Sequence, residues 1–229
     1  ADSVVFNGDV NALAGGLLGD ELLGAAPAMP VGKRSLSAVT WAVHARTSGF
    51  PLVRHNVFFE PDYSAEFDDI FVRRRLPRQG TVYVCAQDRS DDAADPGPTE
   101  RLLCLVNAPA EGDRRPFGPE EIDPCHTQAL DLMRHCGLQL HTAPQQVQTS
   151  TPAVFESLFP ATGGALYGPA THGWMMLFKR AAAASRLPGL YLAGGSVHPG
   201  PGVPMAAMSG RLAAETLMAH LDSTSRSRR

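Results

Sequence analysis

Residues 190–205 read Leu190-Tyr191-Leu192-Ala193-Gly194-Gly195-Ser196-Val197-His198-Pro199-Gly200-Pro201-Gly202-Val203-Pro204-Met205. The apolar run that opens this stretch is typical of a short strand, and the residues after Pro204 have the composition of a helix. Between them, glycines expose backbone N–H groups and let a planar ligand approach the main chain closely. The N-terminus of the following helix favours anions through its free N–H groups and its dipole. The stretch therefore predicts a strand–loop–helix corner that binds a phosphate-bearing cofactor.

Two other interpretations of this corner stay open. One is a packing corner without a ligand, in which small residues of the helix allow close approach: Ala206, Gly210, Ala213 and Ala214. The other is a hydrolase elbow with Ser196 as nucleophile, because residues 194–198 resemble G-x-S-x-G after a strand. An elbow needs its helix directly after the serine, whereas Pro199 and Pro201 keep the chain extended. The prolines therefore count against the elbow.

The glycines do not form a dinucleotide fingerprint. After Gly200-Pro201-Gly202, Met205 stands where G-x-G-x-x-G has its third glycine, and no complete fingerprint occurs in the 229 residues. The corner therefore looks like the second flavin contact of a protein whose fingerprint lies near its N-terminus. The chain also opens on Ala1 and runs at once into a strand-like segment. We expect a C-terminal fragment that binds FAD weakly and is inactive by itself.

Composition places the chain among globular proteins. Its 229 residues are 44% hydrophobic and 19% charged, which suits one large or two small domains. The net charge of −3 argues against nucleic-acid binding, which requires a basic surface. The four cysteines form no C-x-x-C and indicate reduced thiols. No run has the length of a membrane span, and no signal peptide is visible.

Two further clusters have simple interpretations. Cys125-His126 and His135-Cys136 could suggest a metal, but on one predicted helix they lie too far apart to hold one ion, so no metal site is predicted. The run Arg73-Arg74-Arg75 with Arg78 could contact anionic lipid. A solvated helix end is the simpler interpretation of these arginines.

Local patterns predict an α/β fold of mixed α+β character. Strands are expected at residues 3–6, 35–45, 52–59, 81–87, 102–107 and 190–192, the first of them buried. Helices are expected at 10–24, 119–136, 152–159 and 204–221, with a further one after Pro61. The run of strands between 35 and 107 suggests an antiparallel sheet inserted between pieces of a cofactor-binding α/β layer.

Beyond these patterns, the sequence resembles a known family. The run from Leu190 to Glu215 is similar to the C-terminal signature of the FAD-dependent carotenoid desaturases, within the phytoene desaturase and amine oxidase superfamily. Four earlier segments resemble the bacterial 1-hydroxycarotenoid 3,4-desaturases (methoxyneurosporene dehydrogenases): residues 35–41, 48–59, 81–89 and 163–174. The resemblance covers most of the chain.

The resemblance implies the C-terminal part of a two-domain flavoprotein, with a mixed β-sheet substrate domain and the last strand and helix of a Rossmann-like FAD domain. Residues 1–30 would return to the FAD domain, 31–180 would bind substrate, 181–222 would form the last strand, loop and helix, and 223–229 a disordered tail. Gly194 and Gly195 would lie near the pyrophosphate and ribityl chain. The isoalloxazine would lie against Gly202, Val203, Pro204 and Met205. The turn Asn7-Gly8-Asp9 resembles a weaker contact.

The implied reaction removes two hydrogens from a saturated C–C pair of an acyclic hydroxy- or methoxy-carotenoid, with the flavin accepting hydride. Such a substrate needs an apolar channel, for which the aromatic candidates are Trp41, Phe58, Phe159 and Trp174, with Phe59 and Phe155 as further ones. By position, His172 and His198 are the candidate acid or base. The resemblance also implies a bacterial cytoplasmic enzyme, peripheral to the inner membrane and lacking here its N-terminal part. A non-catalytic flavoprotein-like binding module and a hydrolase using Ser196 are the alternatives.

Overall fold

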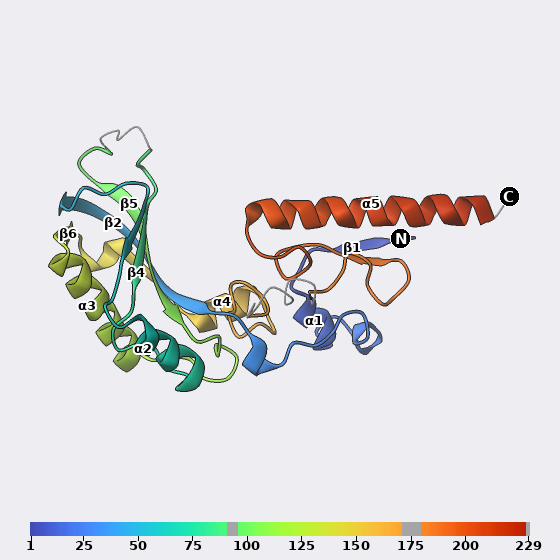
Figure 1. Ribbon diagram of the computed structural model, residues 1–229, viewed down its shortest axis with the longest axis horizontal. Helices are drawn as coiled ribbons and strands as arrows, with labels where there is room; N and C mark the ends of the chain where they lie inside the picture. Colours follow the sequence, from blue (N-terminus) through green and yellow to red (C-terminus); the bar gives the residue numbers. More distant parts are fainter. Residues whose placement is uncertain (91–95, 171–179, 228–229) are drawn as a thin grey trace. The chain divides into compact units, whose positions relative to one another are not determined.

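The computed structural model describes residues 1–90, 96–170 and 180–227, with side chains as far as residue 223. The chain forms two compact units (Figure 1). The terminal unit joins Ala1–Ser35 to Glu156–Arg229, and the inserted unit is Leu36–Phe155. The compact insertion is shorter than the segment 31–180 that we expect to bind substrate, and the functional boundaries of that segment stay a prediction.

The inserted unit is built on one antiparallel sheet, which confirms the antiparallel insertion predicted from the run of strands. The strands follow the order β3-β4-β5-β2-β6, and β7 also pairs with β2. Their bounds are β2 Ser37–Gly49, β3 His55–Phe58, β4 Val82–Ala86, β5 Glu100–Ala108, β6 Leu138–His141 and β7 Val147–Ser150. The long β2 therefore pairs with β5 on one side and with the short strands β6 and β7 on the other.

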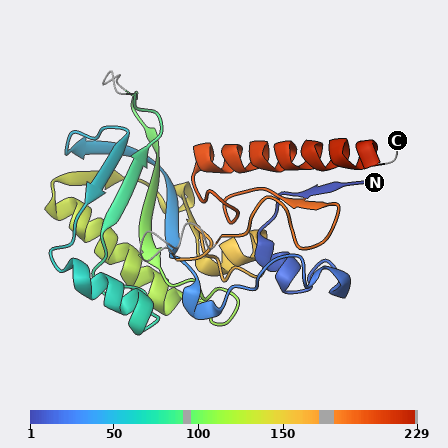
Figure 2. The same ribbon diagram turned by 45° about the vertical axis from the view of Figure 1, so that its right-hand side comes forward.

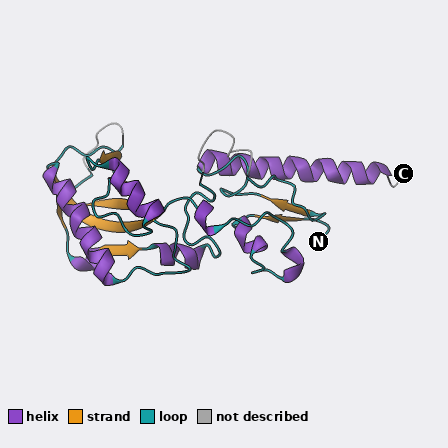
Figure 3. Ribbon diagram, turned by 60° about the horizontal axis from the view of Figure 1, so that its bottom comes forward, coloured by secondary structure: helices purple, strands orange, loops and turns teal. Residues whose placement is uncertain are grey.

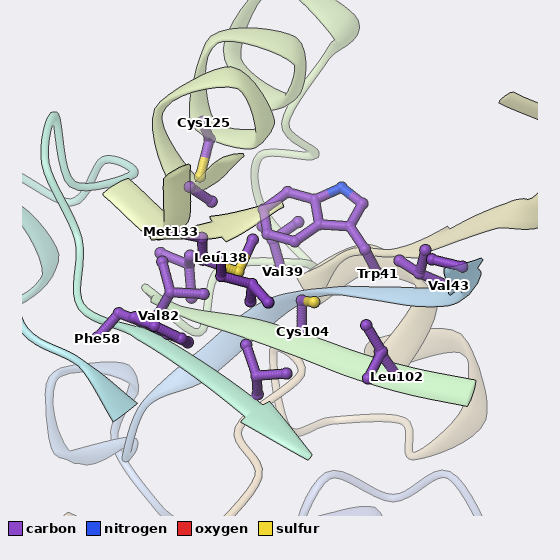
Figure 4. Packing of buried hydrophobic residues seen from close by; sticks show 14 of the residues in the cluster. Val39, Trp41, Val43, Phe58, Val82, Leu102, Cys104, Cys125, Met133 and Leu138 are labelled. Carbon is purple, nitrogen blue, oxygen red and sulfur yellow. The ribbon is translucent and has the colours of Figure 1, made fainter. Parts of the chain in front are cut away.

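Helix α3 (Pro119–His135) lies across one face of this sheet (Figures 2 and 3). It begins with Pro at its first position and acidic residues in its first turn, and Gly137 with φ +93° follows its end. Alternating burial along β4 and β5 turns every second side chain toward the helix. Figure 4 shows the resulting core, in which Cys125 and Met133 of α3 cluster with strand residues such as Val39 and Trp41.

Helix α2 (Tyr63–Phe67) ends in an arginine-rich turn. Asp62 caps the helix by accepting the Ala65 N–H at 3.1 Å. A single π turn at Asp68–Val72 continues the helix, and Arg74 follows in the left-handed region with φ +53°. The arginine run therefore lies at the end of a helix, as the simpler interpretation predicts.

The terminal unit is built on a parallel pair of strands from opposite ends of the chain, β1 (Val4–Phe6) and β8 (Leu190–Leu192). Helix α1 (Val10–Ala14) follows β1, and α5 (Val203–Ser227) follows β8. Ala213 of α5 packs against Tyr191 and Ala193. Figure 1 shows α5 running along the strand pair. Helix α4 is Pro152–Leu158, and short 3-10 turns lie at Asp20–Leu22, Val31–Lys33 and Pro144–Gln146.

Two expectations about this unit are wrong. The helix expected at 10–24 is only Val10–Ala14, because Gly16 and Gly19 adopt φ of +74° and +116°, which no α-helix accommodates. Strand β1 is not buried, because it belongs to a two-stranded sheet in which Val4 and Val5 are half-exposed. The helix expected at 204–221 runs on, and its backbone is helical as far as Ser227.

Candidate functional site

The carboxyl ends of β1 and β8 lie at the same edge of their parallel pair, which is where α/β folds place ligands. The turn 7–9 follows β1, and residues 193–202, here called the glycine-proline loop, follow β8. Ala193 donates its N–H to Phe6 O at 3.0 Å. A Cβ added to Gly194 would lie 3.5 Å from Asn7 Nδ2. The turn and the loop therefore lie side by side at one edge.

Hydrogen bonds tie the glycine-proline loop to α5 and to a neighbouring segment. Gly194 donates its N–H to Ser209 Oγ at 2.8 Å, and Ser209 Oγ donates to Ala206 O at 2.6 Å. His198 donates its N–H to Ala181 O at 2.9 Å. Since the Gly194 N–H is used within the protein, Gly194 shapes the loop through its φ of +122° and does not offer a donor to a ligand.

Open space surrounds the start of α5. A Cβ added to Gly202, whose φ is +100°, would meet no atom within 4 Å. Val203 is 84% exposed and Met205 40% exposed, and Pro204 is exposed as well. In this first turn the N–H groups of Val203 and Met205 have no partner within the helix, and Pro204 has no N–H. These positions offer two donors and an unobstructed backbone, which fits a planar cofactor.

A buried polar network lies beside the loop. Asp9 caps α1, and its Oδ1 accepts the Asn11 N–H at 2.9 Å and Asn11 Nδ2 at 2.8 Å. Burial raises the pKa of Asp9, and hydrogen bonds from Asn11 and Ser196 and the charge of Arg180 only partly offset it. Asn11 Oδ1 accepts the Met29 N–H at 3.2 Å. The network thus joins the turn after β1 to the glycine-proline loop.

Ser196 belongs to this network. It is buried, its Oγ accepts the Val10 N–H at 3.3 Å, and it hydrogen-bonds Asp9. A nucleophilic serine must be reachable by its substrate and activated by a base. The burial of Ser196 and the use of its hydroxyl by Val10 and Asp9 give it a structural role, so the geometry does not support a hydrolase elbow.

No motif in the sequence marks Arg180, yet the structure places its guanidinium against the glycine-proline loop. The residue is only 6% exposed. Its guanidinium donates to Gly195 O at 3.2 Å, to Tyr167 O at 3.0 Å and to Pro169 O at 3.2 Å. Arg180 therefore joins residues 167–169 to the glycine-proline loop. In the sequence, it is marked only as a charged residue before the alanines at 181–184.

The candidate acid or base stays a prediction. His198 is half-buried within the glycine-proline loop. His172 and Trp174 lie outside the described residues. His220 of α5 contacts Tyr191, with Nδ1 2.9 Å from the phenol oxygen, and this pair lies on the helix face that packs on β8.

The aromatic candidates for a substrate channel lie in different environments. Trp41 and Phe58 are 1% and 3% exposed and pack in the core beneath α3. Trp41 stacks on His126 with ring centroids 4.8 Å apart, and burial lowers the pKa of that histidine despite the opposing charge of Asp123. Phe59 and Phe159 are exposed, and Phe155 is half-buried. Trp41 and Phe58 therefore already have a core role, and a role in a channel stays a prediction for all of them.

The face of the sheet opposite α3 carries a partly exposed apolar strip among polar side chains such as His55 and Asn107. Val57, Tyr83 and Leu105 stand opposite one another on β3, β4 and β5, and Cys85 and Leu103 form the next row. Strand alternation turns these side chains away from the core beneath α3. Val57 is 47% exposed, and the other four are half-buried. We call these five residues the second sheet face; the sequence patterns did not mark them, because each strand alternates two apolar faces.

The arginine run is largely neutralised within the inserted unit. Arg73 and Arg75 each lie 2.7 Å from Oδ1 of the buried Asp69, and Arg74 lies 3.8 Å from Glu111. These ion pairs favour the helix-end interpretation over a lipid contact.

The cysteines are free, and burial raises the pKa of the Cys104 and Cys125 thiols to about 12. In the described parts of the chain, no three histidine, cysteine or acidic side chains gather as a metal site would require. None of the described helices is both long and apolar enough to cross a lipid bilayer.

No protein-family model matches the chain, but curated proteins do. The hydroxyneurosporene desaturase of Rubrivivax gelatinosus is 73% identical over 229 residues, which are 100% of this chain and 44% of that protein. The protein of the same name from Cereibacter sphaeroides is 46% identical over 226 residues, 99% of this chain and 45% of that protein. A 1-hydroxycarotenoid 3,4-desaturase from a Flavobacterium species is 28% identical over 187 residues, which are 81% of this chain and 38% of that protein.

The chain thus spans slightly less than half the length of the curated relatives it matches. Among solved structures, an oxidoreductase from Methanosarcina mazei has a TM-score of 0.44 and 17% identity over 96% of this chain and 43% of the other, a likeness too weak to bear on function. The alignment with the Rubrivivax gelatinosus protein, which is 73% identical, spans the whole of this chain. The chain belongs to the carotenoid desaturase family.

Proposed function

We propose that the chain is the C-terminal part of an FAD-dependent desaturase of an acyclic hydroxy- or methoxy-carotenoid in carotenoid biosynthesis. The observation that carries this proposal is the corner in the terminal unit, where the glycine-proline loop leaves the parallel strand pair and leads to the open start of α5. Relatives named as hydroxyneurosporene desaturases support the substrate class.

FAD, when bound, supplies the acceptor for the hydride that leaves the substrate. The chain's own contribution is to bind and orient it. The N–H groups of Val203 and Met205 can donate to it, and the missing side chain of Gly202 lets a ring approach the backbone. No acidic residue occurs between 193 and 205, so the loop adds no charge that would repel the pyrophosphate.

The second sheet face is the surface that we propose contacts the carotenoid. A hydrocarbon chain offers few polar groups, so its binding energy comes mainly from burial of apolar surface. Val57, Leu103 and Leu105 provide such a surface while the opposite face of the sheet is occupied by α3. A carotenoid bound against this surface would displace water from it, which helps to keep water from the reaction.

We further propose that the full-length enzyme works in the bacterial cytoplasm, peripheral to the inner membrane. The support is chemical, because an acyclic carotenoid partitions into lipid and must be collected there. Flotation of the full-length protein with phospholipid vesicles that contain the carotenoid checks this proposal. We expect the protein to float with the vesicles, and protein that stays in the dense fraction would contradict the membrane association.

Substitution of Gly202 tests the flavin site. Gly202→Leu in the full-length protein places a branched side chain where the structure leaves open space at φ +100°. We expect the dissociation constant for FAD to rise at least about 10-fold, because the ring can no longer approach the backbone. Flavin absorbance of the purified protein and titration of the apoprotein measure this change.

Gly97→Leu is the matched control for that variant. Gly97 also has a positive φ, +89°, and also has no atom within 4 Å of an added Cβ, but it lies in the inserted unit. It therefore carries a similar backbone strain but belongs to the unit that does not contain the glycine-proline loop. Equal loss of flavin in both variants would remove Gly202 from the site.

Incubation of the FAD-loaded full-length protein with an acyclic hydroxycarotenoid tests the reaction itself. A new conjugated double bond moves the carotenoid absorption to longer wavelength. Flavin binding without that shift would favour a non-catalytic binding module. An esterase activity that Ser196→Ala abolishes would favour a hydrolase instead.

A further inference from the structure

Arg180 is a buried cation whose hydrogen-bond partners, within the described residues, are backbone carbonyls. The guanidinium donates to the carbonyl oxygens of Tyr167, Pro169 and Gly195, and its buried Nε has no hydrogen-bond partner in the part of the chain that the structure describes. Burial lowers the pKa of Arg180, and the charge of Asp9 opposes that shift. A buried guanidinium without a paired carboxylate and with an unused donor is costly. Stability of the fold alone is therefore a poor explanation for this residue.

The backbone is shaped around the guanidinium at two glycines. A Cβ added to Gly168 would lie 3.1 Å from Arg180 Nη1, and one added to Gly200 would lie 3.3 Å from Arg180 Nε. Both glycines have positive φ, +66° and +138°, which L side chains rarely adopt. The segment 167–169 and the glycine-proline loop therefore both depend on where the guanidinium lies.

The hydrogen bond to Gly195 also sets the direction of a peptide group. Because the Gly195 carbonyl points at the guanidinium, the trans peptide turns the N–H of Ser196 away from it. The same contact fixes the loop a few residues before Gly202, whose open backbone leads into α5. Arg180 thus controls the shape of the glycine-proline loop from the buried side of that loop.

We propose that Arg180 is a positioning residue for the cofactor, which holds the glycine-proline loop in the shape that binds FAD. This inference rests on the proposed function. Arg180 acts through the Gly195 carbonyl and through its packing against Gly200, and it places a positive charge behind a loop that faces a diphosphate. The neighbouring Asp9, whose pKa burial raises, offsets only part of that charge.

The test compares Arg180→Met and Arg180→Lys with the wild type in the full-length protein. We expect Arg180→Met to raise the dissociation constant for FAD about 10-fold or more and to change the visible absorption and circular dichroism of bound flavin. At saturating FAD, the KM for carotenoid should stay near the wild-type value. Arg180→Lys should recover only part of the affinity, because an ammonium cannot match the fork of a guanidinium that reaches three carbonyls.

Arg89→Met separates this role from a general loss of stability. Arg89 is also a partly buried arginine, and it donates from Nε and Nη2 to the two oxygens of Glu100 at 2.8 Å in the inserted unit. We expect it to lower the melting temperature while leaving the FAD dissociation constant within about 2-fold of wild type. Gly168→Ala provides a second variant should Arg180→Met not fold, because it displaces Nη1 from outside the loop and should weaken FAD binding severalfold.

Three results would overturn the inference. Folded Arg180→Met with wild-type FAD affinity and flavin spectrum would remove the positioning role alone. Equal losses of FAD affinity in Arg180→Met and Arg89→Met would show that Arg180 acts only through stability. Wild-type protein that binds no FAD would overturn the proposed function itself, and with it this inference.

Discussion

Asp69 is almost fully buried, yet it stays ionised because arginines surround it. Oδ1 accepts from Arg73 Nη1 at 2.7 Å and from Arg75 Nη2 at 2.7 Å, and Oδ2 accepts the Arg78 N–H at 3.2 Å. Burial acts to raise the pKa of Asp69, but the hydrogen bonds from Arg75 and Arg73 outweigh it and lower the pKa from 3.8 to about 2. This one carboxylate holds the turn that follows α2 in place.

Stability should depend on the ionisation of Asp69. Because its pKa is lower in the folded state, its contribution is present above about pH 4 and is lost as pH falls toward 2. We expect Asp69→Asn to lower the free energy of unfolding at pH 7 by up to about 2 kcal/mol, an upper figure because solvent screens the half-exposed Arg73. The variant should also lose stability less steeply than wild type between pH 4 and pH 2. Urea denaturation across this range measures both effects.

Asp131→Asn is the control for this prediction. Asp131 pairs with Arg134, but both side chains are more than half exposed, so the expected change is below about 0.5 kcal/mol. An Asp69→Asn variant no less stable than Asp131→Asn would contradict the buried role of Asp69.

At the scale of elements, the sequence predicts well where local signals and burial agree. The helix expected at 119–136 is α3, Pro119–His135, because Pro, acidic residues and a terminal glycine mark its ends and an apolar stripe marks its buried face. Strands β4 and β5 correspond to the strands expected at 81–87 and 102–107, because the Asp- and Pro-rich loop between these two runs separates them clearly. The strand–loop–helix at 190–221 is β8, the glycine-proline loop and the larger part of α5.

What the sequence does not predict depends on contacts between distant residues. Nothing local shows that β1 pairs with β8, 186 residues later, or that its valines are half-exposed. The burial of Arg180 depends likewise on carbonyls of residues 167, 169 and 195. The glycine-proline loop, proposed to bind FAD, is visible in the sequence as a motif, whereas the residues that hold its shape require the tertiary structure.

At the scale of the whole molecule, the proposed function divides between the two units. The terminal unit carries the glycine-proline loop and its supporting network, and the inserted unit carries the second sheet face. The two surfaces have different chemistry, since one exposes backbone donors and the other aliphatic and aromatic side chains. Flavin affinity and carotenoid affinity should therefore respond to different substitutions.

Leu105→Gln in the full-length protein tests this division. Leu105 lies in the middle of the second sheet face, between Tyr83 of β4 and Thr40 of β2. A buried amide without a partner costs about 1–3 kcal/mol, so we expect the KM for carotenoid to rise about 10-fold with FAD content unchanged. Val53→Gln is the control, because Val53 is an equally apolar residue of the same unit that is 59% exposed and lies outside the strands. Since FAD content and KM are measured on one preparation, a parallel loss of both would show that Leu105 supports the fold and not the substrate surface.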